Sequence, residues 1–286
     1  EWIIGDACDK ACNWIIKITC YIMRIYMENK LENYNKLEFK IPVESDDYGD
    51  CSKYVIESIE KIIKEAIENG KNKIVINTNL RFGLPMENIN KIAGPFVEAW
   101  AYQTFYEVLE DRNNKYSLIN VEAKERLNIA DIILQFKRQR KNESSITANV
   151  DVKATAEDIE SSGKSPNITS YARIRSAYIE DPDYIFVILS LKHKVYSERD
   201  NEADLMKGVM EIVRYNAYDL KYISESDISY NPALGTGQLQ IRDIHYVNIV
   251  KRTTWQFCQM LDKKYMASKK AFSEWLRLAE KEEWIK

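Results

Sequence analysis

A β-hairpin is predicted by two apolar stretches that flank a basic segment: Ala130-Asp131-Ile132-Ile133-Leu134-Gln135-Phe136, Ile146-Thr147-Ala148-Asn149-Val150-Asp151-Val152-Lys153 and, between them, residues 137–145. If the two strands pair antiparallel, their centre of symmetry lies near Lys141, and Asp131 faces Asp151 at the end far from the tip. Side chains alternate between the faces of a strand, so Asp151 and Lys153 point the same way. Two carboxylates and an ammonium group therefore converge at one end of the predicted hairpin.

This group of side chains has the chemistry of a metal-dependent hydrolase. Mg²⁺ prefers oxygen ligands and is usually held by one or two carboxylates together with waters and substrate phosphate. The bound ion lowers the pKa of a coordinated water and neutralises charge on a phosphodiester. A neighbouring lysine orients that water or helps to deprotonate it, and stabilises the negative transition state. We therefore predict that Asp131 and Asp151 hold the metal and that Lys153 positions or activates the water, which is the layout of a PD-(D/E)xK nuclease.

Other pairs in the chain share the spacing of Asp151 and Lys153, because 30% of all residues are charged. They are Glu28-Lys30, Glu122-Lys124, Asp219-Lys221 and Asp262-Lys264. Taken alone, each is expected to be a solvated surface pair that contributes little. Glu122-Lys124 follows a short apolar run and is the strongest rival, but no second carboxylate lies upstream in register with it.

Much of the chain, from about Leu37 to Ile285, resembles the HpaI family of type II restriction endonucleases. The similarity is carried by residues 39–45, 83–95, 149–155, 163–170 and 227–238. The chain is more distantly similar to HincII-like PD-(D/E)xK nucleases. That second similarity is carried by short islands at residues 130–132, 151–153, 166–168 and 242–243.

The resemblance implies an α/β fold with a PD-(D/E)xK restriction-endonuclease-like core, in which a mixed central sheet is flanked by helices and followed by a helical C-terminal tail. It implies Mg²⁺-dependent cleavage of both strands of duplex DNA at a GTYRAC-type palindrome, GTTAAC in particular, leaving blunt ends. A palindromic site calls for a twofold-symmetric reader, so a homodimer is expected. A cytoplasmic location and a cognate DNA methyltransferase that protects the host are expected as well.

The resemblance also implies which residues contact DNA, and it places them in the loop after the second hairpin strand and in a turn further along. They are Lys164, Asn167, Asn231 and Gln238. Asn and Gln suit the N6/N7 edge of adenine in the major groove. Whether Lys164 inserts into the base stack, contacts phosphate or does neither stays open. The residues themselves add Arg173, on the following helix, as a further DNA-contacting candidate. Taken singly, Arg173, Arg175, Lys192 and Lys194 are expected to be solvated charges, whereas together they can neutralise several phosphates.

Bulk composition agrees with an enzyme of this kind without identifying it. At 286 residues and 45% hydrophobic, the chain can bury a full core, and we expect one domain over residues 34–286. The net charge of −3 gives no polybasic character, so a DNA-binding surface must come from local clusters. Five cysteines without a CxxC pair argue against a zinc site or a disulfide framework. Residues 1–33 are expected to be either an N-terminal extension of uncertain origin or an amphipathic arm that packs on the domain or on a partner subunit, and they contain no apolar run of membrane-spanning length.

Hydrophobic periodicity predicts a mixed order of helices and strands. Helices are expected over residues 54–67, 95–109, 170–179 and 205–214, and a helical tail over 254–284. Besides the hairpin, strands are expected over residues 74–76, 184–191 and 238–242. The run 184–191 is continuously apolar, which is typical of a strand that is buried on both faces.

Two alternative functions remain open at this point. One is a PD-(D/E)xK nuclease with repair or structure-specific substrates, and the other is a DNA-binding relative without catalysis. The intact Asp131, Asp151 and Lys153 set speaks against the second. Glu98 lies on the helix that precedes the hairpin, where it is either a further acid near the metal or, the more ordinary reading, a solvated helix residue.

Overall fold

A computed structural model of the protein describes residues 28–124, 128–137, 145–233 and 235–286. Its helices, apart from the N-terminal one, are α2 (Tyr48–Glu68), α3 (Met86–Lys91), α4 (Ala93–Glu110), α5 (Tyr171–Glu180), α6 (Thr254–Met266) and α7 (Phe272–Lys281). Its strands are β1 (Lys73–Ile76), β2 (Leu118–Ala123), β3 (Ile132–Phe136), β4 (Ile146–Ala156), β5 (Asn167–Ser170), β6 (Ile185–Asp200), β7 (Leu205–Asp219), β8 (Ile228–Asn231) and β9 (Gln238–Ile241).

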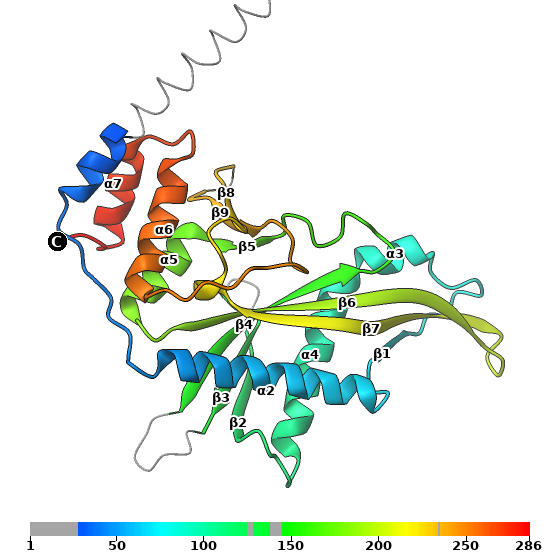
Figure 1. The fold of residues 1–286 in the computed structure, drawn as a ribbon. Coiled ribbons are helices and arrows are strands. Elements are labelled where there is room, and N and C mark those ends of the chain that lie inside the picture. Colours follow the sequence, from blue (N-terminus) through cyan, green and yellow to red (C-terminus); the bar gives the residue numbers. More distant parts are fainter. Residues whose placement is uncertain (1–27, 125–127, 138–144, 234) are drawn as a thin grey trace, which may run out of the picture.

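The strands form two sheets, and the larger one is mixed. Its order is β1-β7-β6-β4-β3-β2, in which β4 and β6 run parallel and every other neighbouring pair is antiparallel. A smaller antiparallel sheet has the order β5-β9-β8. Figure 1 shows the small sheet beside α5 and α6, and shows β6 and β7 continuing as a long ribbon beyond the other strands. The chain is therefore a mixed α/β protein with a mixed central sheet and flanking helices, as expected.

The hairpin of β3 and β4 has the predicted register. Ile132 pairs with Val150 and Phe136 pairs with Ile146, so the ladder is centred on position 141. The predicted basic tip lies largely outside the described residues, because 138–144 are not described. The symmetry of the two apolar stretches about the tip was sufficient to predict this register.

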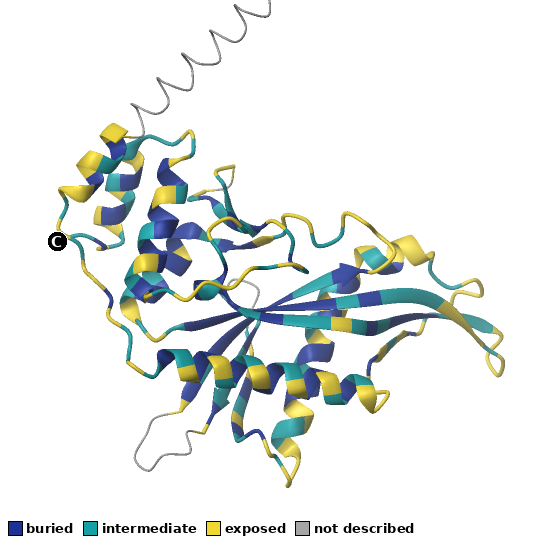
Figure 2. Cartoon of the chain, in the orientation of Figure 1, coloured by how far each residue is buried: buried dark blue, intermediate teal, exposed yellow. Residues whose placement is uncertain are grey.

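Alternation along β4 and β6 divides the apolar side chains between two cores. Val150 and Val152 of β4 and Leu189 of β6 pack against α2 and α4. Phe186 and Ile188 of β6 face the other way and pack against α5, α6 and α7. Figure 2 shows the resulting central band of buried strand residues between exposed edges. Each fully buried side chain of this size contributes about 1.5–3 kcal/mol.

Several predicted elements are confirmed and one is wrong. The expected helices over 54–67 and 170–179 lie within or nearly coincide with α2 and α5, and the apolar run 184–191 begins the buried strand β6. Residues 205–214, however, belong to strand β7 and not to a helix. The buried residues Val209, Met210 and Ile212 have a spacing that is compatible with one side of a helix, so the local pattern alone did not exclude a helix. Antiparallel pairing with β6 extends from Leu205 to Asp219 with a single register shift, between Ile212 and Arg214, and this pairing decides for the strand.

Two further expectations are corrected in part. Helix α4 buries Trp100 and Phe105 as expected, but Phe96 is 38% exposed and Ala99 also lies on the outer side. The expected helical tail is two helices, α6 and α7, separated at residues 267–271. The first of them begins at a capping box, in which the side chains of Thr253 and Gln256 each accept from the other's backbone N–H.

The N-terminal end of the described chain packs on the C-terminal helices. Residues 28–35 are helical, and Lys30 donates through Nζ to the carbonyls of Met266 and Lys270, at 2.8 and 2.9 Å. A bridge between Phe39 and Ile285 joins two segments near opposite ends of the described chain. Residues 1–27 lie outside the described chain, so most of the predicted extension over 1–33 has no structural account. Within the described ranges, no helix combines the length and apolar character needed to cross a bilayer.

Candidate active site and base-reading surface

The main chain of the hairpin fixes the position of Asp131. Its N–H donates to the carbonyl of Val150 at 2.9 Å, which extends the β3–β4 pairing by one residue. Its carboxylate Oδ2 accepts the N–H of Val152 at 2.8 Å. Asp131 is therefore held beside Asp151, its expected partner across the hairpin, and the carboxylate has a defined direction.

Asp151 and Lys153 are joined on the same face of β4. Lys153 Nζ donates to Asp151 Oδ1 at 2.9 Å. Asp151 is only 4% exposed, and this burial raises the pKa of its carboxyl group from 3.8 to about 7. The charge of Lys153 opposes the increase and the charge of Asp131 adds to it. The two carboxylates and the ammonium group thus interact electrostatically, as the sequence predicts.

A third carboxylate approaches from α4. Burial raises the pKa of Glu98, the charge of Asp131 raises it further, and the charge of Lys153 lowers it. Glu98 in turn contributes to the raised pKa of Asp151. The sequence favoured a solvated glutamate here, whereas the structure makes Glu98 half-buried and places it within electrostatic reach of the other charged groups.

The site meets the chemical requirements of a hard divalent cation. Asp151 Oδ2 is buried and has no hydrogen-bond partner among the described residues, and the same holds for Thr155 Oγ1 and Ser190 Oγ. Thr155 follows Lys153 on the same face of β4, and Ser190 lies opposite Lys153 on β6. A buried polar atom without a partner costs about 1–3 kcal/mol. A hydrated cation would provide partners for such oxygens.

The number of protein ligands also fits such an ion. The described residues contain no cluster of three or more His, Cys, Asp or Glu side chains arranged to hold a metal. Mg²⁺ usually keeps several waters and takes only one or two carboxylates, whereas a structural zinc site needs a full set of protein ligands. Asp131 and Asp151 supply two carboxylates, which is the number that Mg²⁺ usually takes from a protein.

The rival acid-x-lysine pairs have other environments. Glu122 and Lys124 form a surface ion pair. Asp219 is buried and accepts hydrogen bonds from Tyr48 and Ser52 at 2.8 and 2.6 Å. Asp262 is buried in an ion pair of its own, described below. None of these three acids has a second carboxylate in register across a hairpin, so Asp151-Lys153 is distinguished by its surroundings.

Three of the predicted DNA-contacting residues come together on the small sheet. Asn167 on β5 pairs with Gln240 on β9, and Asn231 on β8 pairs with Gln238 on β9. The alternate β9 residues, Leu239 and Ile241, are buried in the core. The opposite face of the sheet therefore carries polar side chains. We call it the amide face, and its members are Asn167, Ser229, Asn231, Gln238 and Gln240.

Gln240 was missed from the sequence, although a signal was present. Gln238-Leu239-Gln240-Ile241 alternates polar and apolar, so Gln240 must share the face of Gln238. Its Nε2 donates to Asn167 Oδ1 at 3.0 Å and to the carbonyl of Ser165 at 3.2 Å. Residues from two segments far apart in the chain are thus joined by a side-chain hydrogen bond.

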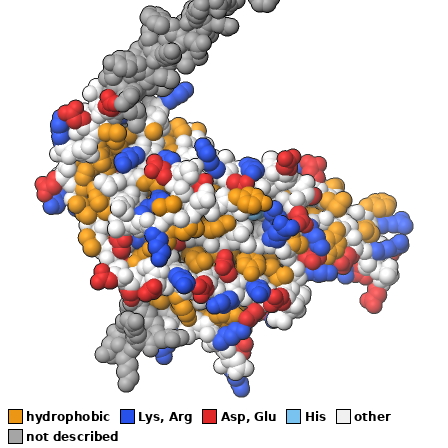
Figure 3. Space-filling model, in the orientation of Figure 1, with side chains coloured by type: hydrophobic (Ala, Val, Ile, Leu, Met, Phe, Trp, Pro, Cys, Tyr) orange, Lys and Arg blue, Asp and Glu red, His pale blue; other side chains and the backbone are white. Residues whose placement is uncertain are grey.

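The basic residues that were predicted to contact DNA differ in their exposure and in their ion pairs. Lys164 forms an ion pair with Asp243, and a backbone bridge joins the same two residues. Arg173 is exposed on α5, and Lys194 pairs with Glu211 at 3.4 Å. On the face shown in Figure 3, basic and acidic side chains are interspersed. This agrees with the small net charge of −3.

Arg175 was expected to help neutralise phosphates, and this is wrong. Its side chain is fully buried and pairs with Asp262, with Nε at 3.2 Å from Oδ1. Tyr34 and Tyr171 donate to the same carboxylate at 2.8 and 2.5 Å. An arginine in this environment has no access to DNA.

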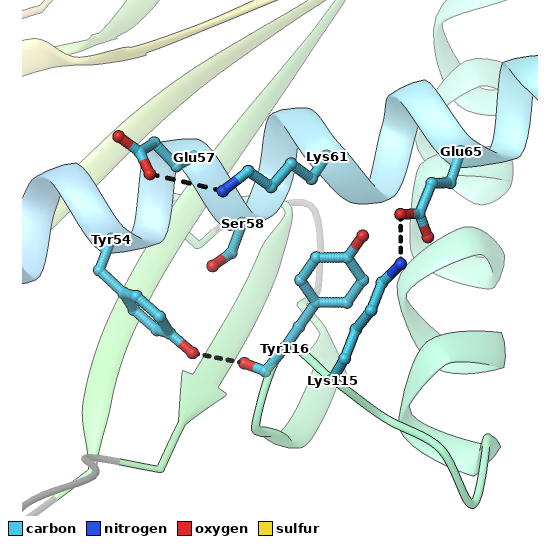
Figure 4. Close-up of a pocket in the computed structure, with 7 residues that line it drawn as sticks. All are labelled: Tyr54, Glu57, Ser58, Lys61, Glu65, Lys115 and Tyr116. Atoms are coloured by element: carbon cyan, nitrogen blue, oxygen red, sulfur yellow. Dashed lines mark hydrogen bonds and ion pairs between the residues drawn. The ribbon is translucent and has the colours of Figure 1, made fainter.

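A separate hollow lies on α2, away from the candidate active site. Figure 4 shows two ion pairs at its rim, Lys61 with Glu57 at 3.5 Å and Lys115 with Glu65 at 2.6 Å. Tyr54 closes one side by donating to the carbonyl of Tyr116 at 2.7 Å. The hollow shares no residue with the site on β3 and β4, and its charged groups are paired with one another.

Comparisons with known proteins agree on one family. The profile described as Type II restriction endonuclease HpaI matches residues 35–283. The type II restriction enzyme HpaI of Haemophilus parainfluenzae is 60% identical over 228 residues, which cover 80% of this chain and 89% of that protein.

Proposed function

Because this chain belongs to the HpaI family of type II restriction endonucleases, we propose that it cleaves both strands of duplex DNA with Asp131, Asp151 and Lys153. Enzymes of this type hydrolyse phosphodiester bonds at specific DNA sites and generally need a divalent metal, for which we propose Mg²⁺. The single observation that carries the assignment is the buried Asp151, whose Oδ1 binds Lys153 and whose Oδ2 has no partner among the described residues.

The roles of the three residues follow from their positions. Asp131 and Asp151 would hold the cation, with Asp131 oriented by the N–H of Val152. When bound, the ion supplies an acidified water and neutralises charge on the scissile phosphate. Lys153 Nζ would orient the attacking water and stabilise negative charge on the phosphate oxygens. Burial of the Asp151 carboxylate would strengthen these interactions, because the local dielectric is low.

The fold proposed for this site is the PD-(D/E)xK core. Support comes from the mixed sheet, in which the acid-bearing hairpin β3–β4 is followed by a helix and by the buried parallel strand β6. Helix α4, which precedes the hairpin in the sequence, carries Glu98, whose carboxyl group interacts electrostatically with Asp131 and Lys153. We propose Glu98 as a residue that tunes the charge of the site.

The recognition proposed for the amide face is of a GTYRAC-type palindrome, GTTAAC in particular, with central cleavage that leaves blunt ends. Asn167, Asn231 and Gln238 would contact base edges, while Arg173 would contact the phosphate backbone. Lys164, paired with Asp243, would lie beside the DNA in the same loop as Asn167. A palindrome requires two copies of this surface, so we propose a homodimer. The enzyme would act in the cytoplasm beside a cognate DNA methyltransferase.

The proposal is tested by digesting DNA of known sequence with Mg²⁺ and mapping both ends of every fragment. Discrete fragments are expected, with blunt ends at the centre of GTTAAC. Asp151→Ala protein purified in parallel should give none. Cleavage confined to junctions, flaps or free ends would instead favour a repair nuclease. Binding of DNA without any Mg²⁺-dependent cutting would favour a non-catalytic relative.

A further inference from the structure

The hydrogen bond between Gln240 and Asn167 determines which atoms of the Asn167 side-chain amide remain free to contact DNA. We propose that Gln240 is a positioning residue that fixes the orientation of the Asn167 side-chain amide, so that Asn167 reads a base edge bearing a hydrogen-bond acceptor. This inference rests on the proposed base-reading role of Asn167 and adds the residue that controls it.

The orientation follows from a third group, the main-chain carbonyl of Ser165. That oxygen can only accept a hydrogen bond, so the Gln240 atom that faces it at 3.2 Å must be the nitrogen Nε2. The same Nε2 lies 3.0 Å from the Asn167 side chain, and a donor there requires an acceptor opposite it. Asn167 must therefore turn Oδ1 toward Gln240. The arrangement does not depend on how the two amides are assigned individually.

The backbone around Ser165 is held in place. Ser165 has a φ of 48°, in the left-handed region that non-glycine residues rarely adopt. Its N–H donates to the carbonyl of Arg242 at 3.0 Å. The neighbouring residue Lys164 is bound to Asp243 by both backbone and side chain. The carbonyl that orients Gln240 is thus anchored to the chain just beyond β9.

The orientation determines what Asn167 offers to a ligand. With Oδ1 engaged, the other branch of the amide is Nδ2, and its two N–H groups are donors. Asn167 is exposed, so these donors are accessible. Donors match acceptors on base edges, such as O6 and N7 of guanine, O4 of thymine or N7 of adenine. They do not match the N4 amino group of cytosine.

The test measures discrimination at every base pair of the cleavage site. Single-turnover cleavage is followed on the mapped site and on duplexes with one base pair exchanged, for the wild type, Gln240→Leu, Asn167→Ala and the double variant. Binding of the same duplexes in Ca²⁺ provides a readout that needs no catalysis. Gln103→Leu is the matched control, because Gln103 is exposed on α4 and its side-chain amide donates to Glu107 of the same helix.

Asn167→Ala should reduce discrimination about tenfold or more at one base pair per half-site, since a good base contact is worth that much. Gln240→Leu should reduce discrimination at the same base pair, and the double variant should lose no more than Asn167→Ala alone. Gln103→Leu should match the wild type. Thermal unfolding identifies any loss that comes from misfolding. Asn167→Asp should lose the same base preference, because it replaces the two N–H donors by an acceptor while leaving Gln240 intact.

The outcomes distinguish a failure of the positioning role of Gln240 from a failure of the base-reading role of Asn167. If Asn167→Ala alters discrimination and Gln240→Leu does not, the positioning role of Gln240 is wrong while the base-reading role of Asn167 stands. An additional loss in the double variant also overturns the inference, because Gln240 would then read a base itself. If Asn167→Ala leaves discrimination unchanged at every position, the proposed function of Asn167 is wrong, and the inference is overturned with it.

Discussion

Val152 donates its main-chain N–H to Oδ2 of Asp131 over 2.8 Å, at the point where the β3–β4 ladder ends. The hydrogen bond joins the two strands of the hairpin through a side chain that we propose as a metal ligand. Its structural and chemical roles can therefore be separated by substitution.

Asp131→Asn and Asp131→Ala should both abolish cleavage, but only the second should weaken the fold. Asparagine keeps an oxygen that accepts from Val152, whereas alanine leaves a part-buried donor unpaired, at a cost of about 1–3 kcal/mol. Urea unfolding and single-turnover cleavage measure the two effects. Equal stability of the two variants would contradict the structural role, and wild-type cleavage by either would contradict metal binding.

Lys153→Ala should slow the chemical step by about 10²–10⁴-fold, the range typical of a positioned group that assists proton transfer. Lys124→Ala is the matched control, because Lys124 has the same spacing from an acid but forms a surface ion pair. It should cleave at the wild-type rate. DNA binding in Ca²⁺ should be similar for both variants. Slowing of similar size by Lys124→Ala would remove the distinction between the two pairs.

Stability without divalent metal should depend on pH through Asp151. Its pKa is raised from 3.8 to about 7, so between these values the unfolded chain is ionised there while the folded protein keeps the proton. The proton on Asp151 therefore costs the folded protein no stability below about pH 4. As the pH rises toward 7, keeping that proton lowers the free energy of unfolding by at most about 1.4 kcal/mol per pH unit.

Asp151→Asn has no such group, so its stability relative to the wild type should increase between pH 4 and pH 7. Urea unfolding in EDTA at several pH values measures the difference, and the carboxyl groups that do not interact with Asp151 cancel in the comparison. Mg²⁺ at pH 8 should then stabilise the wild type more than the variant. Parallel pH curves for the two proteins would refute the buried, proton-binding state of Asp151.

Asp262→Ala should destabilise the protein by about 3–5 kcal/mol, because it leaves Arg175 buried without its ion partner. Replacing both residues, with Arg175→Met and Asp262→Leu, should recover part of this loss. Glu68→Ala is the control, since its pair with Lys64 is exposed and such pairs contribute about 0.3–0.5 kcal/mol. The free energy of unfolding in urea measures all three. A change below 1 kcal/mol in Asp262→Ala would show that Arg175 finds solvent, contrary to its complete burial.

Local patterns were sufficient for the hairpin and its charged residues. Alternation places Asp151 and Lys153 on one face, and the symmetry of the two apolar stretches places Asp131 opposite Asp151, as the register confirms. Local patterns were insufficient for β7, whose residues 205–214 were assigned to a helix. The strand exists because β6 supplies its hydrogen-bond partners, and no short window of sequence contains that pairing.

Distance along the chain explains the other errors. Arg175 reads as one more basic residue on a helix until folding brings Asp262 beside it, 87 positions away. Glu98 reads as a solvated glutamate until the sheet brings Asp131 and Lys153 within electrostatic reach. Gln240 shares a face with Gln238 by alternation, but its bond to Asn167 spans 73 positions.

The sequence by itself determined the hairpin, its register and the residue types of the candidate active site, because strand periodicity is a property of consecutive residues. Only the tertiary structure decided which charges are buried in pairs, which remain at the surface, and which amides meet across the small sheet. These outcomes depend on desolvation and on hydrogen-bond partners from distant segments, and both exist only once the chain has folded.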